Sequence, residues 1–346
     1  MEKIQFGNTD LMVSKVAMGG IPIMRLGFEE GVKVIDEVLN MGINFIDTAN
    51  AYGDSEIKIG AAIRNHKREN LVLASKSLAT DKKTFLEHLN LSLERMGIDY
   101  IDIYQMHGVS TKEAMEKVLS EDGAYSGLRE AVSSGKVRYF AFSSHSPLIA
   151  KQLMGTKKFQ VVQIPFNFVD IEPEDELLPL AHKLKMGVIA MKPMGGGILQ
   201  DANLAFRYLA QFEGIVPDPG VEKTEEMAEI VQIVNSPRPL TLSENEEIKK
   251  IRKEMAGQWC HRCGYCMPCQ NDINIPAVLV AKSTIKRMSA QASLRFLEVP
   301  IEKAKDCTEC RKCIEKCPYN LDIPAFLKEN IVLWENYKKE FLKNKD

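Results

Sequence analysis

The chain has 346 residues, 45% of them hydrophobic and 27% charged, with a formal net charge of −2. This length favours one large domain with a smaller one, and the near-neutral charge argues against a nucleic-acid partner. No apolar run approaches the roughly 18 residues that a membrane-spanning helix needs, and the amino terminus has no secretory signal pattern. We therefore expect no membrane partner and a cytoplasmic location.

Short apolar runs alternate with helical patterns over the first 240 residues. Residues 29–42 and 81–97 place apolar side chains every three to four positions and end at a glycine, which is typical of amphipathic helices. Such helices between near-continuous apolar strands predict a parallel sheet, and eight units of this kind predict an α/β fold, the (β/α)8 TIM barrel. A doubly wound open sheet is the alternative, but no G-x-G-x-x-G follows the first strand. The eight expected strands are residues 16–20, 43–48, 71–76, 101–107, 137–144, 161–167, 187–193 and 213–220.

Two segments flank the predicted barrel units. Residues 6–14 predict a hairpin that turns at Asn-Thr-Asp and plugs the N-terminal end of the barrel. Residues 241–256 predict a capped helix with Ser243 as its N-cap. We therefore expect a barrel over residues 1–240, this connecting helix, and a small, mostly helical ferredoxin-like domain over residues 257–346.

Four polar side chains lie at or just after the ends of three consecutive expected strands, where such barrels carry their catalytic groups. They are Asp47, Tyr52, Lys76 and His107. Together they suit carbonyl reduction, because a tyrosine hydroxyl can donate a proton to a developing alkoxide and an adjacent ammonium stabilises the phenolate. Asp47 would hold Lys76, and His107 would orient the carbonyl oxygen.

The same stretches resemble the aldo-keto reductase family. The matching segments are "GINFIDTANAYGDSE" (42–56), "LVLASK" (71–76) and "YIDIYQMHG" (100–108), within a likeness that covers roughly residues 1–235. The resemblance implies an oxidoreductase whose catalytic tetrad is the four side chains above. It also implies NADP or NAD as the cofactor and a small-molecule carbonyl compound, an aldehyde, a ketone or a quinone-like molecule, as the substrate.

The resemblance further implies where the nicotinamide cofactor binds. Ser143, Ser144 and Gln163 occupy the positions that hold the carboxamide, and residues 195–197 and 219–223 match the pyrophosphate and adenosine-phosphate regions. Barrels in general bind phosphate after strands 7 and 8. The candidate cofactor residues are Ser143, Ser144, Gln163, Lys192, Gly195, Gly196, Gly197, Gly220 and Lys223.

Three features of this region depart from the family pattern or leave alternatives open. Met191 lies where the family usually stacks an aromatic ring on the nicotinamide. Three glutamates at residues 222–226 favour a ribose hydroxyl over a phosphate, which leaves the choice between NADPH and NADH open. Lys192 ends a strand inside the barrel mouth, where support by a salt bridge fits as well as contact with the cofactor or the substrate.

All 8 cysteines lie between Cys260 and Cys317. The second run, C-x2-C-x2-C-x3-C-P, has the bacterial ferredoxin spacing, in which three cysteines ligate one [4Fe–4S] cluster and the fourth ligates the other. The first run begins alike but lacks the final proline, and this near-repeat predicts that the two runs exchange their fourth ligands. The region resembles the helical dicluster ferredoxin domains of redox enzymes. The predicted ligand sets are Cys260, Cys263 and Cys266 with Cys317, and Cys307, Cys310 and Cys313 with Cys269.

Alternatives remain for the metal and for the function. Paired C-x2-C units also make four-thiolate zinc sites, although the C-x3-C-P ending favours iron. Nicotinamide transfers two electrons as a hydride, whereas a cluster transfers one. The clusters could therefore be structural, or a flavin or a quinone-like substrate could connect them to an external ferredoxin or another electron carrier. An iron–sulfur electron-transfer protein with a non-catalytic or flavin-using barrel is the alternative function.

Overall fold

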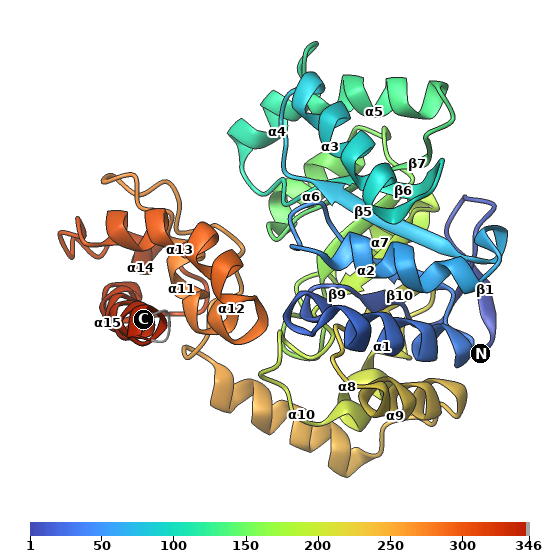
Figure 1. Ribbon diagram of the computed structural model, residues 1–346. Helices are drawn as coiled ribbons and strands as arrows, with labels where there is room; N and C mark the ends of the chain where they lie inside the picture. The colour runs from blue at the N-terminus through green and yellow to red at the C-terminus, as the bar shows by residue number, and fades with distance from the viewer. Residues whose placement is uncertain (344–346) are drawn as a thin grey trace. The chain divides into compact units, whose positions relative to one another are not determined.

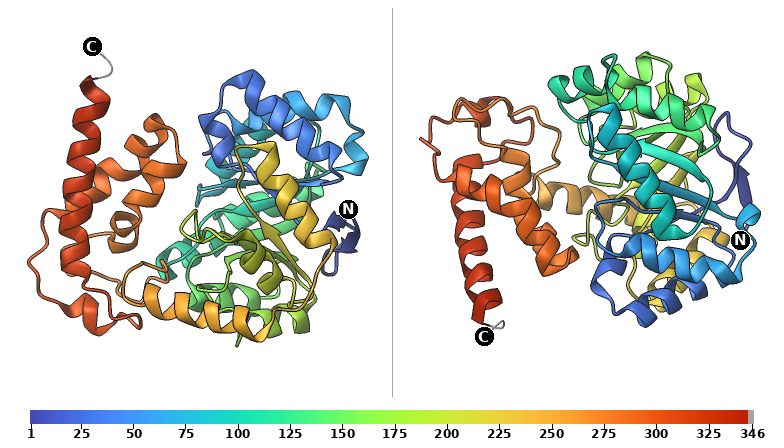
Figure 2. Two further views of the ribbon diagram at one scale, coloured as in Figure 1. Left: turned by 90° about the horizontal axis from the view of Figure 1, so that it is seen from below. Right: turned by 45° about the horizontal axis from the view of Figure 1, so that its top comes forward.

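The computed structural model describes residues 1–343, with side chains as far as residue 341. The chain divides into two compact units, Met1–Ile248 and a second unit that begins at Lys249. Figures 1 and 2 show strands surrounded by helices in the first unit and a set of helices in the second. No helix within residues 1–343 is long and apolar enough to cross a membrane.

The first unit contains a sheet of eight strands in which all neighbouring strands are parallel. The strand order follows the chain, so each apolar run predicted as a strand pairs with the next one. The strands are β3 (Met18–Gly19), β4 (Phe45–Asp47), β5 (Val72–Ser77), β6 (Ile101–Met106), β7 (Val137–Ser143), β8 (Val161–Pro165), β9 (Gly187–Met191) and β10 (Ile215–Asp218).

The first and last strands of this sheet meet and close it into a barrel. The Ala17 amide donates to the Pro217 carbonyl oxygen at 2.9 Å, and the Gly19 amide donates to the Pro219 carbonyl oxygen at 2.8 Å. A parallel bridge also joins Gly19 to Gly220. The prediction of a (β/α)8 barrel is therefore confirmed, and the doubly wound open sheet is excluded.

Helices follow the strands and cover the outside of the barrel (Figure 1). Their ends carry the expected local signals: at α3, the Asp81 side chain accepts a hydrogen bond from the Thr84 amide at 2.9 Å, and Gly97 ends the helix with a φ of 65°. The helices of this unit are α1 (Phe28–Asn40), α2 (Ser55–Ala62), α3 (Lys82–Met96), α4 (Lys112–Leu119), α5 (Ala124–Ser133), α6 (Pro147–Gly155), α7 (Leu177–Leu184), α8 (Ala202–Leu209) and α9 (Thr224–Asn235). Short 3-10 turns lie at Pro22–Arg25, Ile63–Asn65 and Arg68–Asn70.

A hairpin closes the N-terminal end of the barrel, as the sequence predicts. β1 (Lys3–Gln5) pairs antiparallel with β2 (Met12–Ser14). Its loop buries Phe6 and Leu11 in an apolar cluster with the strand residues that begin the barrel interior. Complete burial of a side chain such as Phe6 contributes about 1.5–3 kcal/mol. The strand members of this cluster are Phe45, Val72, Ala74, Ile103, Ala141, Val161, Ile189 and Val216.

The helix that joins the two units, α10 (Leu242–Met255), begins before the predicted N-cap Ser243. The Thr241 amide donates to the Glu244 carboxylate at 2.7 Å, and the Glu244 amide donates to the Thr241 hydroxyl at 3.3 Å. This reciprocal pair is a capping box, so the prediction of Ser243 as N-cap is wrong. Glu244 also accepts a hydrogen bond from the buried Arg207 at 2.8 Å. This contact holds Glu244 in place and favours a helix whose N-cap is Thr241.

The helices of the second unit pack around their own apolar core. Trp334, only 1% exposed, lies in this core with Leu297 and Ile301, and its indole N–H donates to Glu298 at 3.1 Å. The helices are α11 (Ile275–Leu279), α12 (Ala281–Arg287), α13 (Ala290–Ala304), α14 (Lys312–Glu315) and α15 (Ile323–Lys343).

Candidate functional site

The carboxyl ends of β4 and β5 bring Asp47 and Lys76 together. Both residues are 2% exposed, and Lys76 Nζ donates to Asp47 Oδ2 at 2.5 Å and to the Thr48 carbonyl oxygen at 2.6 Å. Burial alone would lower the pKa of Lys76, but the negative charge of Asp47 and further acidic neighbours outweigh it, so the pKa is raised. Lys76 is therefore a buried ammonium that carries its charge at neutral pH.

Tyr52 and His107 lie beside this ammonium. Lys76 Nζ is 5.2 Å from the centroid of the buried Tyr52 ring. The Tyr52 and His107 rings meet edge to face, with their centroids 5.7 Å apart. The His107 amide donates to the Ser77 carbonyl oxygen at 2.9 Å, which fixes the residue at the end of β6. All four side chains that the sequence assigned to one barrel mouth thus lie together in one cluster.

Two amides and a second carboxyl group complete this cluster. Gln105 Nε2 donates to Asp47 Oδ1 at 3.1 Å. Gln163 Nε2 donates to Asp47 Oδ2 and to Asp218 Oδ2, each at 3.0 Å. Sequence reasoning missed Gln105 and Asp218 as members of the site, although both lie near the carboxyl ends of barrel strands and that signal could have found them.

The residues predicted to hold a nicotinamide carboxamide lie on the adjacent strands β7 and β8, where Ser143 is in register with Gln163. Ser143 Oγ accepts from the Gly108 amide at 2.8 Å, and Ser144 Oγ donates to the Ser146 carbonyl oxygen at 3.2 Å. Gln163 Oε1 is buried and has no hydrogen-bond partner among the described residues. A buried acceptor of this kind fits an N–H group of a carboxamide.

A glycine-rich loop follows β9 on the same rim of the barrel. Lys192 comes directly after the strand, and its carbonyl oxygen accepts a hydrogen bond from the Asn167 side chain at 3.1 Å. Gly195, Gly196 and Gly197 have φ values of 57°, 71° and 89°, a backbone conformation that favours glycine. The loop therefore presents main chain without side-chain bulk, which suits close approach of a phosphate.

Gly220 lies at the barrel seam, where the first and last strands meet. Lys223 directly precedes α9. A Cβ atom on Gly220 would come within 2.8 Å of the Pro22 ring, so close packing accounts for this glycine. Glu226 Oε2 accepts hydrogen bonds from the amides of Glu222 at 2.9 Å and Lys223 at 3.2 Å. A carboxylate of the chain itself thus occupies the amino terminus of α9.

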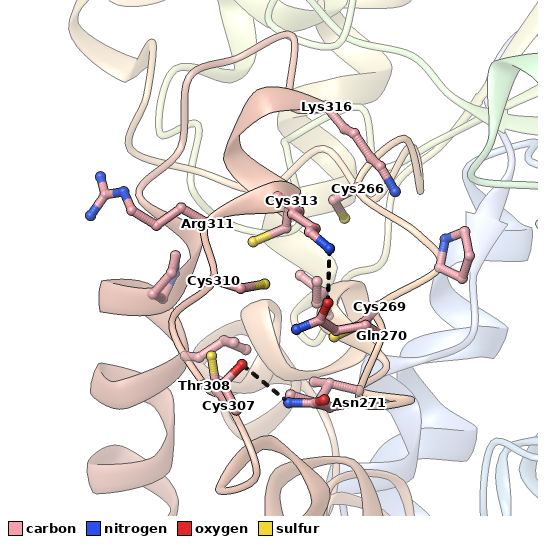
Figure 3. A pocket seen from close by; sticks show the side chains of 16 residues that line it. Cys266, Cys269, Gln270, Asn271, Cys307, Thr308, Cys310, Arg311, Cys313 and Lys316 are labelled. Carbon is pink, nitrogen blue, oxygen red and sulfur yellow. Dashed lines mark hydrogen bonds between the residues drawn. The ribbon is translucent and has the colours of Figure 1, made fainter.

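In the second unit, cysteines from both runs border one cavity of ≈ 270 Å³. Cys307, Cys310 and Cys313 line it together with Cys269 of the first run, and Figure 3 shows their sulfur atoms around the same space. No three metal-ligating side chains within residues 1–343 meet at a single ion-sized point; these four sulfur atoms border the cavity as a whole. The volume is many times that of one water molecule, so it fits a multi-atom group.

The remaining cysteines form a second group. Cys266 also borders the cavity, and burial, followed by the proximity of Cys260, Cys263 and Cys317, raises its pKa to about 12. Such electrostatic effects fall off with distance, so these three thiols lie near Cys266. Cys317 of the second run thus lies near the first three cysteines of the first run, and Cys269 of the first run lines the cavity with Cys307, Cys310 and Cys313.

Cationic side chains border the cysteine cavity. Arg311, Lys312 and Lys316 line it, and its described lining contains no acidic residue. Lys312 Nζ donates to Gln270 Oε1 at 3.1 Å (Figure 3). Positive charge around four thiolates offsets the net negative charge of a thiolate-ligated iron–sulfur group, so these residues fit such a group.

The two cysteine runs belong to a longer internal repeat that sequence reasoning missed. "DINIPAVL" (272–279) corresponds to "NLDIPAFL" (320–327), a similarity visible in the sequence itself. In each copy the side chain before the Ile-Pro pair, Asn274 or Asp322, accepts from the amide three residues later, at 3.3 Å and 3.5 Å. Residues with positive φ also recur at matching positions, which are Arg262, Gly264 and Asp272 in the first copy and Glu309, Arg311 and Asn320 in the second.

Each of the two units matches a known protein family. Residues 259–322 match the 4Fe-4S dicluster domain, and residues 15–205, more than half of the chain, match the Aldo/keto reductase family. The uncharacterized oxidoreductase YqkF of Bacillus subtilis is 30% identical over 220 residues, which are 59% of this chain and 68% of that protein. The NADH-specific methylglyoxal reductase of Escherichia coli is 28% identical over 229 residues, 58% of this chain and 69% of that enzyme. Other curated relatives are matched over as little as 60% of their length.

A solved structure also shows similarity to the aldo-keto reductases. The holo form of the aldo-keto reductase AKR11C1 from Bacillus halodurans has a TM-score of 0.62 and 26% identity, and the match covers 72% of this chain and 96% of that one. The matches agree with the closed parallel barrel and with the cysteine-rich second unit. The chain is thus an oxidoreductase with a 4Fe-4S dicluster domain, and it belongs to the aldo/keto reductase family.

Proposed function

We propose that the barrel catalyses the NAD(P)H-dependent reduction of a carbonyl compound to an alcohol. The observation that carries this proposal is the buried Lys76 ammonium, 2.5 Å from Asp47 and 5.2 Å from the centroid of the Tyr52 ring. A bound nicotinamide supplies the hydride for the carbonyl carbon. Tyr52 Oη donates its proton to the carbonyl oxygen, and Lys76 stabilises the phenolate that remains. His107 donates a hydrogen bond that orients the same oxygen.

Residues at the ends of β7, β8 and β9 would hold the cofactor. The unpartnered Gln163 Oε1 would accept from the carboxamide, with Ser143 and Ser144 beside it. The loop from Lys192 through Gly195–Gly197 would receive the pyrophosphate. Gly220 and Lys223 would lie toward the adenosine end.

NADH is the cofactor form that this site favours. The 2′-phosphate of NADPH would meet the Glu226 carboxylate at the start of α9, where repulsion opposes its binding. Glu222 nearby is already engaged, since Arg25 Nε donates to it at 2.5 Å. The similarity to an NADH-specific methylglyoxal reductase agrees with this preference and makes methylglyoxal a first substrate to test.

The second unit would hold two [4Fe–4S] clusters, which supply one-electron transfer when bound. The cysteine cavity with its cationic border and the grouping of Cys266 with thiols of both runs support crossed ligation. An external ferredoxin or another one-electron carrier is the natural partner of such clusters. The ligand sets are Cys260, Cys263, Cys266 and Cys317 for one cluster, and Cys269, Cys307, Cys310 and Cys313 for the other.

An electron-transfer protein with a flavin in the barrel is the second candidate function. The observation that favours it is Met191 at the end of β9, in place of the aromatic ring expected to stack on a nicotinamide. Chemical analysis of anaerobically purified protein for iron, sulfide and bound flavin separates the two candidates. Bound flavin together with the absence of nicotinamide-dependent turnover would favour the second.

Steady-state kinetics of Tyr52→Phe test the reductase directly. The variant keeps the ring beside Lys76 but has no proton to donate, so kcat for NADH-dependent reduction of methylglyoxal falls by about 10²–10⁴-fold. Tyr125→Phe is the matched control, because Tyr125 packs among Phe140 and Phe159 outside the cluster. A Tyr52→Phe enzyme with wild-type kcat would contradict the proposal.

A further inference from the structure

Asp218 is a buried carboxyl group that the proposed mechanism does not use. It ends β10 and is 8% exposed, and its Oδ1 has no hydrogen-bond partner among the described residues. A Cβ atom on Gly19 would lie 2.9 Å from that oxygen, so the carboxyl group is packed directly against the barrel seam. A charge in such a place is costly unless it is paired.

A second carboxyl group, that of Asp47, accepts from the same amide as Asp218. Gln163 Nε2 donates to one oxygen of each, at 3.0 Å in both cases, so one amide group holds the two carboxyl groups close together. Two ionised carboxylates in one buried site repel each other, and a proton on one of them removes that repulsion. Lys76 donates to Asp47 at 2.5 Å, which keeps Asp47 the ionised partner.

We propose that Asp218 carries a proton that it shares with Asp47, and that Asp218 is a positioning residue for the Asp47–Lys76 pair. Burial and then repulsion from Asp47 raise the pKa of Asp218 well above its usual range, in agreement with this geometry. The charged groups that act on it most strongly are Asp47 of β4 and Lys76 of β5. Gln163 of β8 and the Gly19 main chain of β3 are its uncharged neighbours.

The shared proton has a consequence for catalysis that rests on the proposed carbonyl reduction. With Asp218 protonated, Lys76 faces one negative charge and can stabilise a Tyr52 phenolate. Ionisation of Asp218 at high pH adds a second negative charge that opposes the phenolate. The rate of reduction therefore falls on the alkaline side as Asp218 loses its proton.

The pH dependence of stability tests the shared proton without any turnover. Because the pKa of folded Asp218 is raised, its contribution to stability is complete below the unfolded value of ~3.9 and is lost as the pH rises through the folded value. D218N keeps a donor toward Asp47 and an acceptor toward Gln163 but does not ionise. In calorimetry of the anaerobic, cluster-loaded protein, the Tm of D218N relative to wild type therefore rises with pH. A Tm difference that stays constant from about pH 4 to about pH 9 would overturn the proposal.

Infrared spectroscopy gives a second measurement that uses the wild-type protein. The wild type is expected to show the band of a protonated carboxylic acid at neutral pH, and D218N to lack it. Asp201→Asn, which changes the N-cap of α8, is the control that keeps the band. A wild-type spectrum with no such band at neutral pH overturns the proposal even if D218N does not fold. If the band is present and no carbonyl compound is reduced, the shared proton stands and the proposed function fails.

The pH profile of reduction separates a positioning role from a merely structural one. Ionisation of the proton donor Tyr52 lowers kcat at high pH in both proteins. The wild type is expected to lose kcat at a lower alkaline pH than D218N, in which no ionisation of residue 218 adds to the fall. An identical alkaline limb in both proteins would assign the fall to another group and overturn the positioning role.

Discussion

The two units hold their candidate functional side chains in opposite ways. In the barrel, Asp47, Lys76 and Gln163 project from paired parallel strands and hydrogen-bond to one another. In the second unit, the cysteines lie mostly in loops, and within the described chain only Cys313 is helical. The barrel site is therefore supported by its own backbone, whereas the cysteine sites depend on the group that they bind.

The largest expected effect is that of iron removal, which should change the second unit and not the barrel. Anaerobic chelation should unfold the second unit, because its loops lose the group that joins them, and should leave the barrel folded. Both tryptophans of the chain, Trp259 and Trp334, lie in the second unit, so their fluorescence reports on it alone. We expect Trp334 to become exposed and its emission to shift to longer wavelength, while circular dichroism retains the barrel signal. Unchanged tryptophan emission after complete iron removal would contradict the contrast.

Crossed ligation is tested by pairs of serine substitutions. If Cys269 and Cys313 serve one cluster, the double variant C269S/C313S should lose no more iron than either single variant, about half of the total. By the same argument, C269S/C263S should lose both clusters. Iron and sulfide analysis with electron paramagnetic resonance of the reduced protein measures this. The reverse pattern, with C269S/C263S losing only half of the iron, would assign each run its own cluster.

A smaller effect is expected at the start of α9. Replacing Glu226 by glutamine removes a carboxylate from a helix amino terminus, an interaction of about 1 kcal/mol, so the NADPH-to-NADH ratio of kcat/KM should rise about fivefold. Glu225→Gln is the matched control, since Glu225 lies in the same first turn and Glu226 is the residue that accepts from the amides of residues 222 and 223. Equal ratios in the two variants would show that Glu226 does not select the cofactor.

The sequence predicted the architecture of the barrel closely. All eight expected strands form, because near-continuous apolar runs between amphipathic helices bury both faces of a parallel sheet. The grouping of the four candidate catalytic side chains follows from the same rule, since all lie at or just after carboxyl ends of neighbouring strands. The alternation of strand and helix thus carried most of the information about the first unit.

What the sequence did not reveal depends on contacts between distant residues. Asp218 lies within one of the expected strands, residues 213–220. Its importance comes from Asp47, which is distant in the chain but accepts from the same Gln163 amide in the folded barrel. The sequence predicts Ser243 as the N-cap of α10, whereas Thr241 takes the position because Arg207 holds Glu244.

The most direct test of the account is the fate of a hydride. Anaerobic protein is given NADH that carries deuterium at nicotinamide C4, together with methylglyoxal or another carbonyl substrate, and the alcohol is analysed by mass spectrometry and NMR. The account predicts that deuterium is found on the former carbonyl carbon, with the oxygen-bound proton coming through Tyr52. With deuterium at both C4 positions, an alcohol with no deuterium on that carbon would contradict direct hydride transfer from NADH in the barrel.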